Sequence, residues 1–339
     1  MSDERMHAVG DDPAWSESYY FNFVDPKSGL GMFTRMGFRP RNGWADALHV
    51  VYLGGERVAF TYGRRDIGLE LAAYDGDLCV GGLTITCEDA FRRWRIAYDG
   101  PAQDIADAGI LITRSKARPE GWFQPARLAM QATFEALTAP HYAGPNAAGG
   151  ERGHFEQSGR VTGAVSLGDG ERAFDGLGVR DKSWGPRNWG GANPGASAAG
   201  GGASAGPRLS TAAAPSPFVN WFSMNFGPDI SLGGSCGRGA DGVVRGQGWM
   251  QEGASVGELT DVVIETAYRP GSILHDAVVL TGQSPSGKRL RIEGRMECVC
   301  PTKIPFAGGA TFVNEGLGRF VLDGREGTGI AEHWHNVVE

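Results

Sequence analysis

The residues best suited to chemistry lie in one short stretch, Gly178 to Trp189, which reads Gly-Val-Arg-Asp-Lys-Ser-Trp-Gly-Pro-Arg-Asn-Trp. Asp181 is its carboxylate, and guanidinium and indole groups flank it. Burial in an apolar pocket disfavours the charged form of a carboxylate, so Asp181 could hold a proton at an unusual pH. Asp181 is therefore the first candidate for a general acid or base. The alternative is a structural ion pair with Arg180 or Arg187.

Strand geometry divides this stretch into two faces. Successive side chains of a strand point to opposite sides, so Asp181 and Ser183 would share one face. Arg180 and Trp184 would share the other. One face would thus carry an acid and a hydroxyl, and the other a cation and an indole.

A second acid–base pair lies upstream in His154-Phe155-Glu156. Its two polar side chains would share a face of a strand, and the pKa of histidine suits proton transfer near neutral pH. The alternative is a solvated strand start after the loop 144–153. The sequence Glu332-His333-Trp334-His335 near the end of the chain could also shuttle protons or be purely structural.

Two pairs of metal-ligand residues are each spaced two apart, Cys298 with Cys300 and His333 with His335. Together they could supply two thiolates and two imidazoles to zinc. Neither pair has zinc-finger spacing, so buried thiols beside strand histidines are favoured and we predict no metal. The odd set of 5 cysteines argues against a disulfide framework.

The elements that must position these residues are strands, because the dominant periodicity of the sequence is two. Residues 49–53 and 57–62 flank Gly54-Gly55 and are typical of a hairpin. Similar short runs continue to the end of the chain, and they could form a sandwich, one large barrel or two barrels. Because barrels remove sheet edges and enclose ligands, we predict an all-β protein of two apposed antiparallel β-barrels.

A tract of Gly, Ala, Ser and Pro from Gly190 to Pro217 interrupts this pattern. It has too little apolar surface to pack, so we favour an inert insertion over a lid. We expect an N-terminal barrel over residues 1–165, a linking motif with the insertion over 166–217, and a C-terminal barrel over 218–339.

Composition excludes several classes of function. The chain has 339 residues, a net charge of −7 and a pI near 5.6, with no basic block, which argues against nucleic-acid binding. No window reaches the roughly 18 apolar residues of a membrane span, and residues 1–15 are polar, so we expect a cytoplasmic protein without membrane insertion. Phosphate-cradling glycine motifs and a Gly-x-Ser-x-Gly elbow are absent, so nucleotide cofactors and acyl-serine chemistry are not expected.

Three patches resemble the two-domain lipocalin-like family that includes bacterial carotenoid hydratases and fungal kievitone hydratase-like proteins, in an uncharacterised bacterial branch. The patches are His154-x-Glu156-Gln157-x-Gly159-Arg160, Gly178-x-Arg180-Asp181-x-Ser183-Trp184-Gly185-x-Arg187 and Gly327-x-Gly329-x-Ala331-Glu332. The resemblance implies two calycin-type barrels, a hydrophobic pocket and cofactor-free acid–base chemistry.

In the hydratases of that family, an Asp shortly before a Trp on an inner strand is implicated in protonating an alkene. Asp181 with Trp184 occupies that pattern here. The hydratases carry Asp-His or Asp-x-Asn before the Trp, whereas this chain has Asp181-Lys182-Ser183. A relative of the same fold is a pericyclic cyclase, so the fold alone does not fix the reaction.

The predicted function is that of a lyase, hydratase or isomerase, without cofactor, acting on a hydrophobic terpenoid, steroid-like or phenylpropanoid (lignin-type) molecule. The alternative is a non-catalytic lipocalin-like carrier of such a ligand, and a homodimer is left open. The expected catalytic residues are Asp181, His154, Glu156, Arg180 and His335. Aromatic and cationic residues are expected to line the substrate pocket, namely Trp184, Arg187, Trp189, Trp221 and Tyr142.

Overall fold

A computed structural model describes residues 3–142, 152–168, 170–187, 217–238, 244–306 and 309–338 of the chain. The described residues form antiparallel strands joined by turns and short 3₁₀ helices. The strands of the N-terminal half are β1 (Trp15–Asp25), β2 (Leu30–Arg39), β3 (Trp44–Gly54), β4 (Arg57–Asp66), β5 (Cys79–Val80), β6 (Leu83–Asp89), β7 (Arg93–Ile105), β8 (Gln124–Ala136), β9 (His141–Tyr142), β10 (Gly153–Leu167) and β11 (Gly170–Pro186).

The 3₁₀ helices all lie in this half: η1 (Pro40–Asn42), η2 (Leu71–Tyr74), η3 (Ala108–Ile112) and η4 (Ser115–Ala117). The strands of the C-terminal half are β12 (Val219–Asn225), β13 (Ile230–Arg238), β14 (Val244–Glu252), β15 (Ser255–Tyr268), β16 (His275–Gln283), β17 (Arg289–Phe306), β18 (Gly309–Leu322) and β19 (Arg325–Val338).

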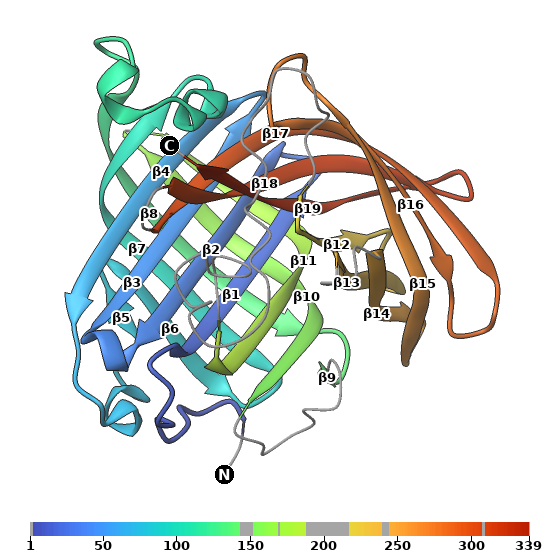
Figure 1. Cartoon of the computed structure of the whole chain (residues 1–339), viewed down its shortest axis with the longest axis horizontal. Helices are drawn as coiled ribbons and strands as arrows, with labels where there is room; N and C mark the ends of the chain where they lie inside the picture. Colours follow the sequence, from blue (N-terminus) through green and yellow to red (C-terminus); the bar gives the residue numbers. More distant parts are fainter. Residues whose placement is uncertain are drawn as a thin grey trace.

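The N-terminal strands make one large sheet in the order β4-β3-β2-β1-β11-β10-β8-β7-β6-β5. The sheet curls so far that β4 also pairs with β7, with Val58 opposite Ile105. This pairing closes a ring of β1, β2, β3, β4, β7, β8, β10 and β11. The C-terminal strands β12 to β19 form a closed barrel in sequence order. Figure 1 shows the two barrels side by side, and the all-β, two-barrel prediction is confirmed.

Burial along the strands shows where the barrels meet. Strand β7 alternates between buried and more exposed positions over most of its length, because one of its faces lines the core and the other faces outward. Strand β1 is buried at every position. Its inner face packs in the N-terminal core, and its outer face packs against the C-terminal barrel.

One apolar cluster joins the barrels. It contains Tyr20 and Tyr52 from the N-terminal barrel together with Trp221, Trp249 and Cys300 from the C-terminal barrel. Polar contacts cross the same junction: Asn22 donates to Ser223 Oγ at 2.9 Å, and Ser158 donates to Gln251 Oε1 at 2.9 Å. The junction is therefore a packed apolar interface in which these polar side chains are paired across the two barrels.

The predicted domain boundaries need one correction. Residues 170–186, expected to belong to a linking motif, form strand β11, which pairs with both β1 and β10. The N-terminal barrel therefore extends to Pro186, because without β11 the strands β1 and β10 would be open edges. The expected insertion, Gly190 to Pro217, lies outside the described residues except for Pro217. In the part of the chain that is described, no helix is long and apolar enough to span a membrane.

Candidate active site between the two barrels

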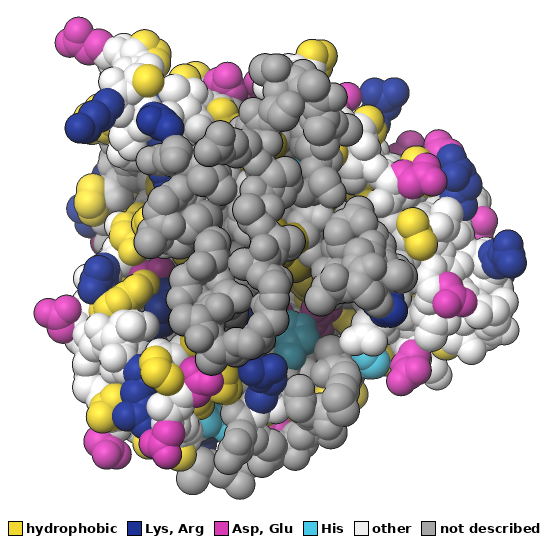
Figure 2. All heavy atoms as spheres, in the orientation of Figure 1, with side chains coloured by type: hydrophobic (Ala, Val, Ile, Leu, Met, Phe, Trp, Pro, Cys, Tyr) yellow, Lys and Arg dark blue, Asp and Glu magenta, His cyan; other side chains and the backbone are white. Residues whose placement is uncertain are grey.

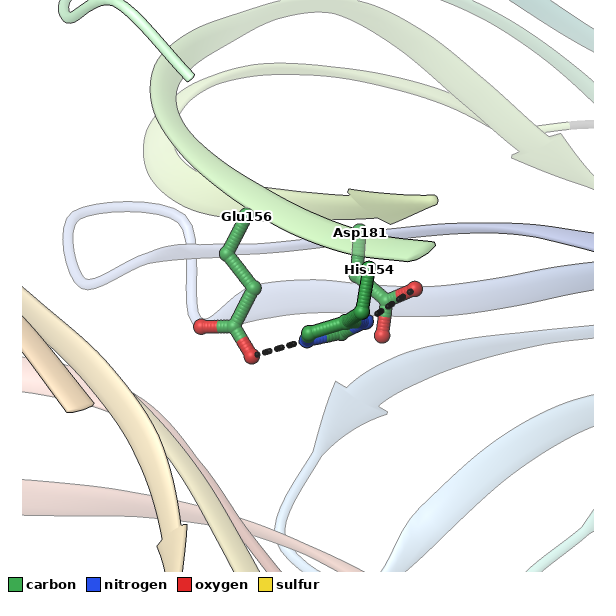
Figure 3. Close-up of side chains that lie close together, drawn as sticks. All are labelled: His154, Glu156 and Asp181. Atoms are coloured by element: carbon green, nitrogen blue, oxygen red, sulfur yellow. Dashed lines mark hydrogen bonds and ion pairs between the residues drawn. The ribbon is translucent and has the colours of Figure 1, made fainter. Parts of the chain in front are cut away.

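Three neighbouring strands bring acid–base residues together on the outer face of the N-terminal barrel. Asp181 on β11 lies directly opposite Glu156 on β10 and Tyr20 on β1. His154 lies opposite Ser183 in the same way. Side chains at such positions have Cβ atoms about 4.5–5.5 Å apart. The register alone therefore gathers His154, Glu156 and Asp181 at one place, as Figure 3 shows.

Hydrogen bonds link these side chains into a continuous chain. His154 Nε2 lies 3.0 Å from Glu156 Oε1, and His154 Nδ1 lies 2.8 Å from Ser183 Oγ. The Ser183 hydroxyl donates to Asp181 Oδ1 at 3.1 Å, and that oxygen is 3.7 Å from His154 Nδ1. The Asp181 side chain is 16% exposed, whereas that of Glu156 is 3% exposed. Of the two carboxylates that end this hydrogen-bonded series, Asp181 is therefore the more accessible and Glu156 the more buried.

The C-terminal barrel completes this arrangement. The indole Nε1 of Trp221 donates to Glu156 Oε1 at 2.7 Å, and that of Trp249 donates to Glu156 Oε2 at 2.6 Å. Gly233 allows this close approach, because a Cβ there would lie 2.5 Å from Glu156 Oε2 and 2.8 Å from Trp249 Nε1. Both oxygens of Glu156 are therefore fixed by donors from the other barrel.

The electrostatic surroundings of His154 and Glu156 favour the charged form of the imidazole. Burial by itself disfavours the imidazolium, but the charge of Asp181 and the hydrogen bond to Glu156 outweigh it and raise the pKa of His154. Burial likewise opposes the charge on Glu156, yet His154 and the two indole donors lower the pKa of Glu156 below its usual value. His154 is thus held as a proton carrier between two carboxylates.

Two further residues border the cluster. Arg187 lies just after β11, and burial lowers the pKa of its guanidinium. The charges of Asp181 and Glu332 oppose that shift. His141 on β9 lies directly opposite Glu156, with its ring 6.5 Å from that of Trp249. Figure 2 shows histidine and acidic atoms set back from the surface between the two barrels.

Among the described residues, one group of three has metal-ligand atoms within 4.8 Å of one another, and it is His154, Glu156 and Asp181. The ligand atoms of two members already have hydrogen-bond partners: both ring nitrogens of His154 are paired, and both oxygens of Glu156 accept indole N–H groups. Metal ligands need free lone pairs directed at the ion. The group is better suited to moving protons than to holding a metal.

Arg180 and Trp184 do not belong to this cluster. They lie on the opposite face of β11 from Asp181 and point into the N-terminal barrel, as strand alternation requires. The guanidinium of Arg180 pairs with the buried carboxylate of Glu4 at 2.6 Å. The indole of Trp184 stacks on His7 with ring centroids 4.1 Å apart. The structure therefore does not bring Arg180 or Trp184, expected as a catalytic and a pocket residue, to the cluster around Asp181.

The same alternation places Tyr142, expected to line the pocket, away from the cluster: it lies opposite Phe155 and donates to Asp3 Oδ2 at 2.8 Å. Its neighbour His141 faces the cluster instead. Trp189 lies outside the described residues.

His335 is also remote from the cluster, because it lies inside the C-terminal barrel beside Tyr268, with ring centroids 5.6 Å apart. The zinc alternative fails for a related reason. Cys300, Glu315 and Glu332 are successive cross-strand neighbours and share the face toward the junction. His333, one residue further along β19, points the other way into the barrel and stacks on His275.

Sequence reasoning missed four residues of this region as site residues: Tyr20, His141, Trp249 and Glu315. They lie on β1, β9, β14 and β18. Their role depends on which strands pair and on which outer face the other barrel covers. No local signal carries that information.

The geometry defines an all-β protein of two lipocalin-like barrels with an acid–base cluster at their junction. The family model described as domain of unknown function DUF7064 matches residues 1–337, and the chain belongs to that family. No curated protein matches the chain.

Solved structures of the same fold include an AttH-type protein from Nitrosomonas europaea, with 12% identity, a TM-score of 0.54, and coverage of 98% of this chain and 95% of that one. Kievitone hydratase from Nectria haematococca is similar at 10% identity and a TM-score of 0.51, with 99% and 92% covered. CghA, solved with Sch210972, is similar at 10% identity and a TM-score of 0.50, with 96% and 89% covered. These likenesses show that the chain shares their fold, as its resemblance to this two-domain family predicted.

Proposed function

We propose that this protein is a lyase of the hydratase type that adds or removes water, or a comparable small group, by acid–base catalysis. The observation that carries the proposal is the hydrogen-bonded series Glu156–His154–Ser183–Asp181, in which an imidazole with a raised pKa lies between two carboxylates. Asp181, the more exposed end, exchanges a proton with the substrate. His154 and Glu156 act behind it, holding and relaying that proton.

The surroundings favour a hydrophobic small molecule as substrate. Aromatic side chains from both barrels border the cluster, including Tyr20, Trp221 and Trp249. Apolar walls with a few convergent polar groups are typical of small-molecule sites. The fold neighbours are consistent with this proposal, since one is named a hydratase and another was solved with Sch210972. A terpenoid, steroid-like or lignin-type phenolic compound fits this description.

The test is to incubate the purified protein with a panel of such compounds and analyse the products by mass spectrometry. Wild type and Asp181→Asn are compared, each with and without a chelator. We expect gain or loss of water, or loss of a small fragment, for at least one compound. Asp181→Asn should lower that turnover by on the order of 10²–10⁴-fold with an unchanged circular dichroism spectrum.

The other outcomes contradict the proposal in different ways. Compounds retained unchanged, with the same affinity for wild type and Asp181→Asn, would indicate a carrier. Turnover abolished by the chelator and restored by a metal would replace the proton relay with metal catalysis.

A further inference from the structure

A second pair of carboxyl groups lies at the junction, on the C-terminal barrel. Glu315 on β18 and Glu332 on β19 are directly opposite each other in the sheet. Their side chains share one face, and both are almost fully buried, with 4% and 8% exposure. Two neighbouring carboxylates in a buried site cannot both remain ionised, so the pair must hold a proton.

Hydrogen bonds indicate where that proton resides. Tyr20, which crosses from the N-terminal barrel, donates its hydroxyl to Glu315 Oε2 at 3.1 Å. The indole of Trp334 donates to Glu332 Oε1. Glu315 and Glu332 are hydrogen-bonded to each other, and the pKa of both carboxyl groups is raised, that of Glu315 well above its usual value. The indole donor of Trp334 and the charge of Arg187 both favour the ionised form of Glu332, so we assign Glu315 as the donor and Glu332 as the acceptor.

The charged groups around the pair explain why it keeps its proton. Burial is the largest effect and raises the pKa of both carboxyl groups, and the charge of Asp181 adds to it. Arg187 opposes the effect at Glu332. The buried thiol of Cys300, directly opposite Glu315, has a raised pKa and stays neutral.

The pair also adjoins the acid–base cluster of the other barrel. Tyr20 donates to Glu315 and is itself the direct cross-strand neighbour of Asp181. Glu332 lies directly opposite Trp221, the residue that donates to Glu156. The two groups thus bound the same junction from opposite barrels.

We propose that Glu315 and Glu332 share one proton and that Glu332 delivers it to the substrate held between the barrels. This inference rests on the proposed function. In the eliminating direction Asp181 takes a proton from carbon, the C–O bond breaks as the C=C bond forms, and Glu332 protonates the departing oxygen, which leaves as water. Asp181 gains the proton that the pair loses, so the step balances. Glu315 is a positioning residue that resupplies Glu332 through their hydrogen bond.

The experiment compares Glu315→Gln and Glu332→Gln with wild type, and Glu297→Gln on β17 serves as the control for replacing one glutamate of this barrel. Glu297 is an exposed residue that pairs with Arg319. The first measurement is the melting temperature as a function of pH. The folded protein holds the Glu315 proton above pH 4.5 while the unfolded chain releases it, so the contribution of the pair to stability should fall as pH rises above that value. Glu315→Gln keeps a neutral donor to Glu332 and removes this contribution, so the melting temperature of the variant relative to wild type should rise with pH.

The second measurement is turnover of the compound that the panel identifies. We expect kcat to fall by on the order of 10²–10⁴-fold in both variants, whereas the control keeps wild-type turnover. An unchanged pH dependence of stability in both variants would show that no proton is shared, which would overturn the inference. The predicted pH dependence with wild-type turnover would overturn the catalytic role. If wild type turns over no compound, the proposed function fails and the role of Glu332 fails with it, while the melting curves still report whether the pair exists.

Discussion

At the scale of single residues, His154 is the centre of the site because both of its ring nitrogens are engaged. One nitrogen contacts the buried carboxylate of Glu156, and the other contacts the hydroxyl of Ser183, which donates to Asp181. A histidine oriented in this way can pass a proton between its neighbours without turning. The residue types near positions 154 and 181 indicate this chemistry, but their mutual orientation comes from the sheet register.

The raised pKa of His154 predicts a pH dependence of stability. Because folding raises the pKa of His154, the stabilisation from its charged form is complete below pH 6.5 and is lost as pH rises through the pKa of the folded state. His154→Gln should therefore be most destabilising at about pH 6, and the difference from wild type should shrink toward about pH 9. Chemical denaturation across this range measures the difference.

His141→Gln is the matched control for this prediction. Burial lowers the pKa of His141 in spite of the charge of Glu156, so its contribution has the opposite sign. Relative to wild type, this variant should become more stable as pH falls. A His154→Gln effect that does not vary with pH would contradict a charged His154.

At the scale of secondary-structure elements, strand β11 separates two kinds of charged site by alternation. Its outer face carries Asp181, and its inner face carries Arg180 and Lys182, which pair with Glu4 and Glu17 inside the barrel. Lys182 and Glu17 are both completely buried at 2.8 Å from each other. Strand β11 therefore contributes an acid–base residue to the junction between the barrels and two buried ion pairs to the core of the N-terminal barrel.

The ion pair of Arg180 with Glu4 inside the barrel predicts an effect on stability and no direct effect on catalysis. Arg180→Ala would leave the buried carboxylate of Glu4 without its guanidinium, which should cost about 3–5 kcal/mol of stability. Arg160→Ala, which removes an exposed partner of Asp175, should change the melting temperature little. A fully stable Arg180→Ala variant that has lost turnover would instead assign Arg180 to catalysis.

Strand β14 contributes a donor that can be tested by a matched pair of substitutions. Trp249→Phe removes the N–H donated to Glu156 Oε2, which should cost about 1.5–3 kcal/mol beyond the loss of packing. Trp94→Phe is the control, because Trp94 is equally buried but its indole nitrogen has no partner among the described residues. Equal destabilisation of the two variants would show that the bond to Glu156 contributes nothing.

At the scale of the whole molecule, the two barrels are joined by an apolar cluster and by hydrogen bonds that cross the junction. The cluster contains Tyr20 and Val179 from one barrel and Trp221 and Leu317 from the other. Interfaces that are large and apolar hold domains in a fixed relation, whereas small polar ones allow them to move. The site needs the fixed relation, because its anchors come from the opposite barrel.

The shared cluster predicts cooperative unfolding. We expect one calorimetric transition for both barrels, since separating them would expose the apolar faces of β1 and β12 and break the indole bonds to Glu156. Asn22→Asp would place a charge against Ser223 and should weaken this coupling. Two well-separated transitions in the wild-type protein would mean that the barrels are independent.

The strand content and the two faces of the motif around Asp181 could be predicted from the sequence, because both follow from the alternation of side chains, a local property of each strand. Alternation left a sandwich, one large barrel and two barrels open, and the prediction of two barrels rested on the removal of sheet edges and on the family resemblance. The sequence also selected His154, Glu156 and Asp181, because their residue types suit proton transfer.

The tertiary structure alone decided which of these residues form a site. Asp181 and Arg180 are adjacent in the sequence, yet one faces the junction and the other the interior of a barrel. Glu315, Tyr20 and Trp249 reach the junction only because strands distant in the chain pair and the barrels dock. Docking depends on the complementarity of two complete surfaces, and no single stretch of sequence encodes both.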